Sequence, residues 1–336
     1  MGRSIVPMAE KNNVVLVTGG AGYIGSHVCY ALKQKGYTPV CFDNLVSGHG
    51  EAVKFGPFVQ GDLLCPKDIE KAMEDHQPMA VIHLAAFIQV GESVKDPLKY
   101  YENNITGAVN LLKAIQAYKV SHLVFSSSAA VYGTPKYTPI DEGHPLCPIN
   151  PYGHTKHMVE SVLQDCDKAF GLKSVSLRYF NAAGGAPEEG LGEAHDPETH
   201  LIPLMILAAQ KQKTLQIFGN DYDTVDGTCV RDYIHVLDLA DAHLKALDYL
   251  MAGGDTICLN LGTEVGVTNL QMAQMIQNLF SKEVPYTFSE RRQGDPAVLL
   301  SSALKAKEVL KWQPQYTIED ILKHAWQWHL REEHGQ

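Results

Sequence analysis

The run Val14-Val15-Leu16-Val17-Thr18-Gly19-Gly20-Ala21-Gly22-Tyr23-Ile24-Gly25 joins four apolar residues to a glycine-rich turn. The apolar residues include several β-branched side chains, and such a run predicts a buried parallel strand. The glycines at 19, 22 and 25 allow a tight turn, the close approach of a pyrophosphate and close packing of a following helix. A helical pattern over 26–35 and an apolar strand over 38–42 come next. This order predicts a βαβ unit that binds a dinucleotide.

The second strand of this unit ends at Asp43. A carboxylate there can accept hydrogen bonds from both hydroxyls of a ribose, whereas it would repel a 2′-phosphate. The chain has no arginine between Arg3 and Arg178 that could offset this repulsion. The N-terminus of the helix over 26–35 offers N–H groups and a partial positive charge to the pyrophosphate. We therefore predict that the cofactor is NAD rather than NADP.

Strands and helices continue to alternate through the first half of the chain. Strands are expected at 58–62, 80–86, 122–128 and 174–179, and helices at 69–75, 100–117 and 152–169. Asp62, at the end of the third strand, is placed to reach an adenine edge. A loop of small residues after the fourth strand lets the backbone pass against the cofactor. Asn103 either meets the cofactor with its amide or caps and packs its own helix.

From about Gly184 the sequence changes to an acidic, glycine-rich loop over 184–198. The elements expected beyond it are a helix over 201–211, a strand and hairpin-like loop over 215–226, a strand over 230–236, a helix capped by Asp238 and running to 250, a strand over 257–261, a helix over 268–280 with Thr268 as N-cap, a polar loop over 291–295, and helices over 301–310 and 317–331. We expect the strand over 257–261 to re-enter the first sheet.

The predicted fold class is α/β, a doubly wound parallel Rossmann sheet with a smaller α/β substrate-binding domain. We assign residues 1–182 and 233–262 to the NAD-binding domain. Residues 183–232 and 263–336 are assigned to the substrate-binding domain.

The bulk composition excludes several classes of protein. The chain is 45% hydrophobic and 20% charged, which is ordinary for a globular protein. A net charge of −10 argues against a nucleic-acid-binding surface. No apolar run reaches the ~18 residues of a membrane span, so we expect no membrane partner. The first 13 residues are interpreted as a short flexible extension, because they lack the apolar core of an export signal.

The cysteines and histidines suggest neither disulfides nor a metal. The seven cysteines are odd in number and contain no Cys-x-x-Cys, which fits a reducing cytoplasm. His195 and His200 form a possible pair among 15 histidines, but the sequence shows no carboxylate-supported metal motif around them. We therefore interpret them as surface or supporting histidines and predict no metal site.

The segment Pro151-Tyr152-Gly153-His154-Thr155-Lys156 places a tyrosine and a lysine four residues apart. In a helix the two side chains share one face. A lysine cation favours the phenolate, so we expect the pKa of Tyr152 to fall from about 10 toward neutrality. Tyr152 would then accept the proton of a sugar hydroxyl. Ser128, at the end of the fifth strand, is the candidate to share that hydroxyl, and no Gly-x-Ser-x-Gly motif supports a serine nucleophile.

Several motifs together resemble those of the extended short-chain dehydrogenase/reductases. They are TGGAGYIG (18–25), Asp43, Gly61-Asp62, HLAA (83–86), SSSAAVYG (126–133), Tyr152-x-x-x-Lys156, RYFNAAG (178–184) and VRDYIHV (230–236). Further segments are similar to the UDP-glucose 4-epimerase branch of that family: FDNLVSGH, VGESV, YYENN, FGNDY, DGTCVRDYIHV and RRQGDPA. The match runs from about 14 to 328. The resemblance implies interconversion of UDP-galactose and UDP-glucose through a transient 4-keto sugar, with tightly bound NAD, in galactose metabolism and by a homodimer.

The resemblance also implies roles for individual residues. Tyr152 matches the catalytic base, Lys156 its partner on the nicotinamide ribose, and Ser128 the hydroxyl at sugar O4. The other positions that match cofactor-binding residues are Gly19, Gly22, Tyr23, Ile24, Gly25, Asp43, Asn44, Asp62, Leu63, Leu84, Ala85, Ala86, Asn103, Ser126 and Tyr179. The positions that match substrate-binding residues are Phe180, Asn181, Leu201, Gln216, Phe218, Arg231, Arg292, Asp295 and Leu299.

The chain departs from some relatives at two positions. A lysine that reaches the cofactor phosphate is replaced by Ile88, with Gln89 beside it, so the phosphate must rely more on backbone N–H groups. A bulky tyrosine of the sugar pocket is replaced by Leu299, which leaves more room near the sugar C2. This second change implies some turnover of N-acetylated UDP-sugars.

Three other functions remain open on the sequence. A nucleotide-sugar 4,6-dehydratase needs an acid pair after the strand-five hydroxyl, whereas Ser128 is followed by Ala129-Ala130. A simple NAD-dependent dehydrogenase would exchange its cofactor and accumulate oxidised product. A non-catalytic nucleotide-sugar sensor on the same fold is disfavoured by the intact set of Tyr152, Lys156 and Ser128.

Overall fold

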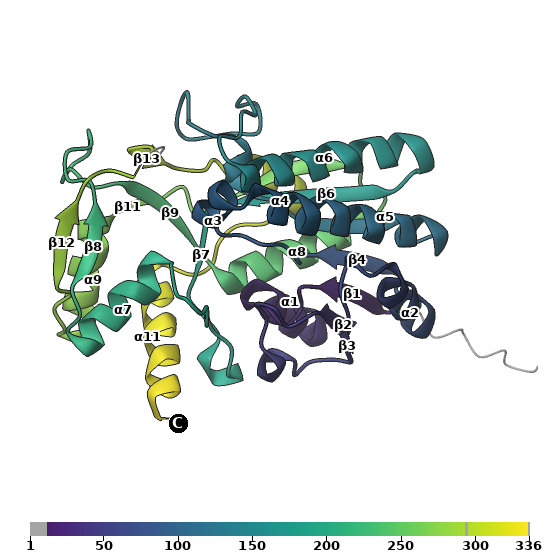
Figure 1. Cartoon of the computed structure of the whole chain (residues 1–336), viewed down its shortest axis with the longest axis horizontal. Helices are drawn as coiled ribbons and strands as arrows, with labels where there is room; N and C mark the ends of the chain where they lie inside the picture. The colour runs from purple at the N-terminus through teal and green to yellow at the C-terminus, as the bar shows by residue number, and fades with distance from the viewer. Residues whose placement is uncertain (1–11, 293–294, 335–336) are drawn as a thin grey trace, which may run out of the picture.

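The structure is a computed structural model that describes residues 12–292 and 295–334 (Figure 1). Residues 1–11 of the expected flexible extension lie outside this range, as do Gln293 and Gly294 of the polar loop. The extension ends earlier than expected, because the Asn12 side chain donates to Gln77 O and Thr38 N donates to Asn13 O.

A parallel sheet of seven strands forms the centre of the larger lobe. Its order is β10-β6-β5-β4-β1-β2-β3, and every neighbouring pair is parallel. The strands are β1 Val14–Thr18, β2 Thr38–Asp43, β3 Phe58–Gln60, β4 Ala80–His83, β5 His122–Ser126, β6 Lys173–Tyr179 and β10 Ile257–Leu261. The strand order reverses between β1 and β4, the switch point where such sheets bind ligands. The predicted Rossmann fold is confirmed, as is the return of β10 to the sheet.

Both faces of this sheet are buried, which explains why its strands are almost continuously apolar. In β1, Val15 and Val17 belong to one hydrophobic core and Leu16 belongs to the other. The first core is covered by α1 Tyr23–Gln34 and α8 Val236–Met251. The second is covered by α2 Pro66–His76, α5 Gly107–Ala117 and α6 Pro151–Phe170. The helices thus hold the carboxyl ends of the strands in place at one edge of the sheet.

The helix expected over 100–117 is divided in the structure. It consists of α4 Pro97–Tyr100, the π-helix η2 Tyr101–Thr106 and α5. The π-helix holds Asn104, whose side chain pairs with both backbone groups of Phe87 and donates to Thr155 Oγ1 on α6. A wide turn at this point therefore fixes the loop after β4 and the helix that carries Tyr152.

The cap expected for α8 is wrong. Its N-cap is His235, whose Nδ1 accepts from Leu237 N. Asp238 lies in the first turn instead, and its carboxylate accepts from Gln315 N and Tyr316 N. An acidic residue in the first turn suits the positive end of the helix dipole as well as a cap does, so composition could not separate the two roles.

A second lobe lies beside the sheet, to the left in Figure 1. Its strands pair in two small sheets, one with β9 Val230–His235 beside β7 Asn181–Ala183, β11 Gly266–Thr268 and β13 Val298–Leu299, and one with β8 Leu215–Phe218 beside β12 Tyr286–Ser289. Its helices are α7 Leu201–Lys211, α9 Asn269–Phe280 and α11 Ile318–His334. The strand expected at the start of 215–226 is confirmed as β8, which pairs in parallel with the distant β12. The loop after it contains a hydrogen bond from Tyr222 N to Gly227 O.

The remaining short elements are the helices α3 Val90–Lys95 and α10 Leu304–Leu310 and the 3-10 turns η1 Gly50–Ala52, η3 Ala129–Val131 and η4 Pro187–Glu189. The predicted cap at Thr268 is confirmed as a capping box with Gln271. Among the helices of the described ranges, none has both the length and the apolar character that a membrane span requires.

Candidate active site

Tyr152 and Lys156 lie on one face of the first turns of α6. The helix begins there because Pro151 occupies its first position and the Asn150 side chain accepts from Gly153 N at 2.8 Å. Lys156 is only 4% exposed, and its Nζ donates to Ser126 O at 2.7 Å. The same Nζ lies 5.8 Å from the centroid of the Tyr152 ring. The end of β5 therefore holds the ammonium group beside the phenol.

The expected fall in the pKa of Tyr152 is wrong for the protein alone. Burial raises the pKa of Tyr152, and a hydrogen bond with Ser128 only partly lowers it. Burial also lowers the pKa of Lys156 to about 7, against the attraction of Glu160. The lysine thus carries less charge than assumed, and its Nζ is directed at a carbonyl. A further cation is needed to favour the phenolate, and an oxidised nicotinamide ring carries such a charge.

Ser128 follows β5 and touches both Tyr152 and its own loop. Its Oγ accepts from Ala130 N at 3.1 Å, which caps the 3-10 turn η3. It also lies close enough to the Tyr152 phenol to lower the pKa of that group. A hydroxyl and a phenol in contact at the carboxyl end of a parallel sheet form a proton-transfer pair with access to a ligand.

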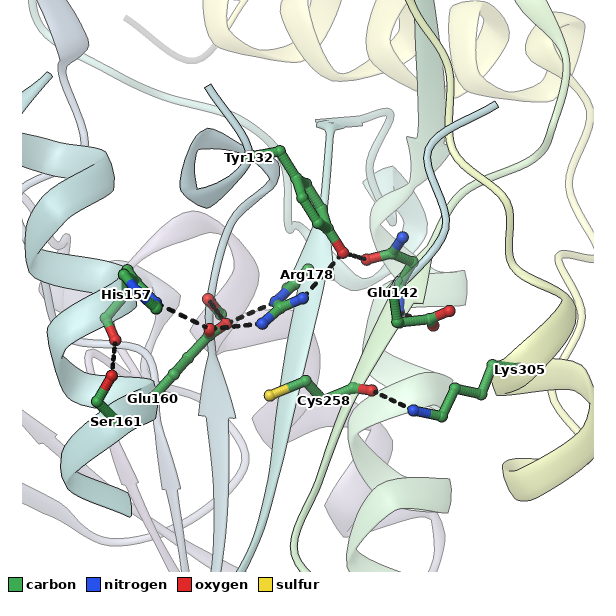
Figure 2. A network of polar contacts seen from close by, with 10 residues as sticks. Tyr132, Glu142, His157, Glu160, Ser161, Arg178, Cys258 and Lys305 are labelled. Carbon is green, nitrogen blue, oxygen red and sulfur yellow. Dashed lines mark hydrogen bonds and ion pairs between the residues drawn. The ribbon is translucent and has the colours of Figure 1, made fainter. Parts of the chain in front are cut away.

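A buried ion pair joins Glu160, on the same helix, to Arg178 on β6 (Figure 2). Glu160 accepts from Arg178 Nε and Nη2 at 2.8 and 2.7 Å, and both side chains are less than 5% exposed. Glu160 also accepts from Ser127 Oγ at 2.6 Å. Arg178 Nη1 donates to the Tyr132 hydroxyl, which donates to Asn260 Oδ1 at 2.6 Å. This network joins α6 to β5, β6 and β10, and sequence reasoning did not identify it.

Ser126 is the last residue of β5, and Tyr179 is the last residue of the neighbouring strand β6. Ser126 Oγ lies 2.7 Å from His243 Nε2, and His243 Nδ1 lies 2.8 Å from Leu239 O. Burial lowers the pKa of His243 to about 4, so the ring is neutral and its Nδ1–H donates to the carbonyl. Burial raises the pKa of Tyr179, and Tyr152 and Ser126 are among its interacting neighbours. Both predicted residues therefore lie at the site, with His243 as an additional support.

The glycine-rich turn fits a dinucleotide diphosphate. Gly19 has a φ of +74°, and a Cβ on Gly25 would lie 2.0 Å from Gly19 O, so side chains at these positions would break the turn. A Cβ on Gly22 would meet only Gly19 O, at 3.3 Å. Helix α1 has no side-chain cap and no acidic residue in its first turn. Its N–H groups at Tyr23 and Ile24 therefore face an anion without a competing carboxylate.

Two acidic residues form the part of the site predicted to hold adenosine. They are Asp43 at the end of β2 and Asp62 shortly after β3. Asp43 is buried, with Oδ2 accepting from Ala21 N at 3.0 Å and Oδ1 from Leu45 N at 2.8 Å. Asn44 donates to Asp62 Oδ2 at 3.1 Å, which brings these two predicted residues together. A carboxylate oxygen can accept more than one hydrogen bond, so Asp43 keeps capacity for a ribose hydroxyl.

The other predicted cofactor residues surround these groups. Leu63 is buried, and its carbonyl accepts from Asn110 of α5. Leu84 and Ala85 both donate their N–H to Thr18 O, and Ala86 follows them in the loop after β4. Asn103 donates to Asn104 Oδ1, so its amide has a structural role. Ile88, which stands where some relatives have a lysine, is 41% exposed and supplies no cation.

Arg231, Arg292 and Asp295 lie together in the second lobe, and we call this group the clamp. Asp295 lies between Arg231 Nη2, at 3.4 Å, and Arg292 Nε, at 3.7 Å. The Arg292 guanidinium stacks 4.3 Å from the centroid of the Phe218 ring on β8, and Gln216 is an exposed neighbour on the same strand. Four of the predicted substrate residues, from three separate segments, thus lie in contact.

The remaining predicted substrate residues lie between the two lobes or beside them. Phe180 and Leu299 pack on one small hydrophobic cluster with Val131 and Tyr132, next to Ser128. Asn181 donates to Asp232 O at 2.8 Å, which fixes the start of β7 against β9. Leu201 is the first residue of α7 and packs on the core of the second lobe. Its position supports the fold of the second lobe.

His195 and His200 have carboxylate neighbours that the sequence did not indicate. The structure surrounds His195 and His200 with the carboxylates of Glu193 and Glu198. No helical spacing places these four residues together, because they lie in the irregular loop before α7.

Comparison with known proteins agrees with this geometry. The sequence profile of the NAD dependent epimerase/dehydratase family matches residues 15–262. The UDP-glucose 4-epimerase of Rhizobium leguminosarum bv. trifolii is 51% identical over 318 residues, which are 94% of this chain and 97% of that protein. The crystal structure of UDP-glucose 4-epimerase from Brucella ovis in complex with NAD has a TM-score of 0.91 and 47% identity, covering 94% of this chain and 97% of that one.

A third similar protein is the UDP-Glc/GlcNAc 4-epimerase from Campylobacter jejuni, with a TM-score of 0.83 and 38% identity over 95% of this chain and 99% of that one. The matched profile covers well over half of the chain, and the likeness to these proteins is nearly full-length. The chain therefore belongs to the NAD dependent epimerase/dehydratase family.

Proposed function

We propose that this chain is a UDP-glucose 4-epimerase that interconverts UDP-galactose and UDP-glucose with tightly bound NAD. The observation that carries the proposal is the placement of Lys156 Nζ at the Ser126 carbonyl and 5.8 Å from the Tyr152 ring, with Ser128 close by, at the carboxyl edge of a dinucleotide-binding sheet. The family membership and the curated relatives of the same activity support it. The alternative, another NAD-dependent nucleotide-sugar epimerase or a 4,6-dehydratase, differs in the pocket rather than in the cofactor.

The residues fit a resident NAD. We assign the diphosphate to the turn at Gly22 and the ribose of adenosine to Asp43, both described above. When bound, NAD supplies a nicotinamide ring that takes a hydride from the sugar and returns it. Lys156, held at the Ser126 carbonyl, lies at the strand end where the second ribose would lie. None of these groups has to move during turnover, which suits a cofactor that is kept.

Inversion at an unactivated carbon requires a proton acceptor for the 4-hydroxyl. We assign this role to Tyr152, because it lies on the face of α6 that carries Lys156 and close to Ser128, at the ligand edge of the sheet. Ser128 can relay the proton or hold the hydroxyl in line. As the 4-hydroxyl is oxidised, its proton passes to the phenolate, and the same phenol returns a proton when the ketone is reduced on its other face.

The sugar has to turn over between the two hydride transfers without being lost. We propose that the clamp of Arg231, Arg292 and Asp295 holds the nucleoside diphosphate, the part of the substrate that does not react. Arginine pairs with diphosphate oxygens through two parallel hydrogen bonds, so the anchoring is strong. The sugar beyond the diphosphate can then rotate while the nucleotide stays bound.

One experiment tests this function against its alternatives. The holoenzyme is incubated with UDP-galactose, UDP-glucose and both N-acetylated analogues, the products are resolved, and the bound cofactor is released and identified. An epimerase forms the 4-epimer with no net reduction of added NAD. Accumulation of a keto or 6-deoxy product, or net NADH, would contradict the proposal.

Leu299 sets a prediction about the breadth of the sugar pocket. It packs with Phe180 beside the Ser128 loop, and a leucine leaves more room than a tyrosine. We therefore expect measurable turnover of UDP-N-acetylglucosamine. The substitution Leu299→Tyr should reduce that turnover at least about tenfold relative to turnover of UDP-glucose. Parallel kcat/KM measurements on both substrates check this, with Leu299→Ile as the control of similar volume. Activity on UDP-glucose alone in the wild type would refute it.

We further propose that the protein is a homodimer. Helices α3, α4 and α6 contact one another and expose Val94, Leu98 and Met158, which are 62%, 77% and 43% exposed. Figure 1 shows these helices along one side of the sheet. An apolar face of this kind suits a two-fold interface, in which the same patch meets itself. The Tyr152 helix would then be supported from its outer side.

The substitution Leu98→Glu should convert the dimer to a monomer at micromolar concentration. A carboxylate in a two-fold apolar interface is desolvated and faces its own copy. Sedimentation or light scattering measures the change in mass. Val225→Glu is the control, because Val225 is 82% exposed and lies in the other lobe. A monomeric wild type, or a Leu98→Glu protein that stays dimeric, would contradict the assignment.

Two broader assignments remain proposals. The division into residues 1–182 with 233–262 and 183–232 with 263–336 is supported by the pairing of β10 with β6 and by the separate core of the second lobe. A cytoplasmic location is supported by seven free thiols.

A further inference from the structure

A cluster of two carboxylates and two imidazoles lies in the loop before α7. Glu193 Oε1 lies 2.8 Å from His200 Nδ1 and 3.2 Å from His195 Nδ1. Glu198 Oε1 lies 3.2 Å from His200 Nδ1, and its Oε2 lies 3.9 Å from His195 Nδ1. The two imidazole rings are 4.9 Å apart at their centroids. Both Nδ1 atoms are thus directed at the same pair of carboxylates.

These distances resemble the edges of a metal coordination shell. Bonds of 2.0–2.1 Å from a tetrahedral Zn²⁺ to nitrogen and oxygen ligands separate the ligand atoms by about 3.3 Å. The four nitrogen–oxygen distances above lie on both sides of this value. One ligand atom from each residue lies within 4.8 Å of all the others, so the widest pair must close by roughly 1.5 Å on binding.

The charge of the cluster also calls for a cation. Glu193 is only 4% exposed, and a carboxylate buried to this degree needs cationic or hydrogen-bonding partners. The Tyr23 ring of the neighbouring lobe lies 6.3 Å from the His195 ring, measured between centroids, so the cluster reaches the boundary with that lobe. His195 Nδ1 is enclosed and has no hydrogen-bond partner among the described residues, although both carboxylates face it. A proton on His200 would neutralise the negative charge of one carboxylate. The other carboxylate would then have only His195 as a partner.

The surroundings place this cluster at a junction of three segments. Trp328 Nε1 of α11 donates to Glu193 O, and His49 Nε2 donates to Ala194 O. The Tyr23 hydroxyl, in the glycine-rich turn, donates to Gly184 O at the start of the same loop. A cavity of about 260 Å³, lined by Tyr23, His195 and Trp328 among others, gives access to the cluster. A cation bound here would fasten the loop against both lobes.

We propose that Glu193, His195, Glu198 and His200 bind one divalent transition-metal cation of the zinc class. Imidazole nitrogen with carboxylate oxygen is a donor set that suits Zn²⁺ and its neighbours rather than Ca²⁺ or Mg²⁺. Its role is structural, because the ligands belong to one loop and hold it at the entrance of the glycine-rich turn. The proposal does not depend on the sugar chemistry, and its test does not use turnover.

The test measures zinc on full-length protein without a histidine tag. The holoenzyme is dialysed against a chelator, then titrated with Zn²⁺ in competition with a chromophoric chelator. We expect one tight site per chain in the wild type. His195→Ala and His200→Ala should weaken this site at least about tenfold. Glu198→Gln, which keeps its shape and its backbone hydrogen bonds, serves as the conservative variant that does not depend on refolding of the loop. His76→Ala, on α2 and outside the cluster, is the matched control.

Thermal unfolding supplies the second readout. Because the cation binds only the folded loop, Zn²⁺ should raise the unfolding midpoint of the wild type by at least about 3 °C and leave that of Glu198→Gln nearly unchanged. A wild type that binds no more zinc than Glu198→Gln, or the same loss of affinity in His76→Ala, would show that the cluster consists of ion pairs with a protonated histidine only.

Discussion

Tyr152→Phe is expected to lower the turnover of UDP-galactose at least ~10²-fold, the usual scale of lost general acid–base help. The substitution removes the hydroxyl that contacts Ser128 and leaves the ring, which the ammonium of Lys156 approaches to 5.8 Å. The anchoring of the nucleotide does not involve this hydroxyl. We therefore expect kcat to fall and the dissociation constant of UDP to stay within about twofold. Steady-state kinetics and UDP titration of the same preparation separate the two.

Two further measurements exclude trivial causes of this loss. The amount of NAD released from wild type and variant should be equal, since a missing cofactor would also abolish activity. Ser128→Ala should lose less activity than Tyr152→Phe, because the phenol can accept the proton directly. A Phe variant with near-wild-type turnover would remove Tyr152 from the mechanism.

The pH dependence gives the same assignment an independent check. Burial raises the pKa of Tyr152 in the protein alone, so the phenolate is the minor form at neutral pH. The rate of a reaction that needs the phenolate rises with pH until the group is ionised. We expect kcat/KM of the wild type to rise from pH 6 toward the alkaline range, and the residual activity of the Phe variant to lack this rise.

The part of the fold that the sequence predicted well is the part with strong periodic signals. β1, β2, β4 and β5 were found because both sheet faces are buried there and these strands are mainly apolar. By contrast, β3 is an edge strand with exposed ends, and β6 alternates polar and apolar residues. The parallel pairing of β8 with β12 joins residues about 70 positions apart, and nothing local records it. The π-helix at 101–106 was also missed, since it arises from the contacts of Asn104 with Phe87 and Thr155.

The same distinction applies to the candidate site, where residues in local motifs were predicted and contacts between distant segments were not. The groups that carry chemistry were found because their motifs are local, as with Tyr152 and Lys156 on one helix face. The pKa of Tyr152 was misjudged, because two features depend on tertiary structure. They are the burial of the phenol and the hydrogen bond that Lys156 Nζ donates to Ser126 O. The supporting ion pair was missed as well. A glutamate at position 160, one turn after Lys156 on the same face, was the available signal, and its partner on β6 could not be read from spacing.

That ion pair carries the second large expected effect. Glu160→Leu should lower the free energy of unfolding by about 3–5 kcal/mol, the cost of leaving a buried charge without its partner. Arg178 is 3% exposed, and Glu160 is its carboxylate partner. Denaturant unfolding of the holoenzyme at pH 7 measures the loss. We also expect reduced activity at temperatures where the variant is folded, because Glu160 holds Ser127 and favours the charged form of Lys156.

The double variant Glu160→Leu with Arg178→Met distinguishes an unpaired charge from a packing defect. Replacing both partners by apolar side chains removes the buried charge, so the double variant should be more stable than Glu160→Leu alone.

The dependence of stability on acid pH tests the same ion pair. Burial raises the pKa of Glu160, but Arg178 outweighs it and holds the pKa below its ordinary value. A depressed carboxyl pKa stabilises the folded state above about pH 4 and loses this contribution as the pH falls. The free energy of unfolding of the wild type should therefore fall relative to that of the double variant below pH 4. A difference that stays constant down to pH 2 would contradict the role assigned to Glu160.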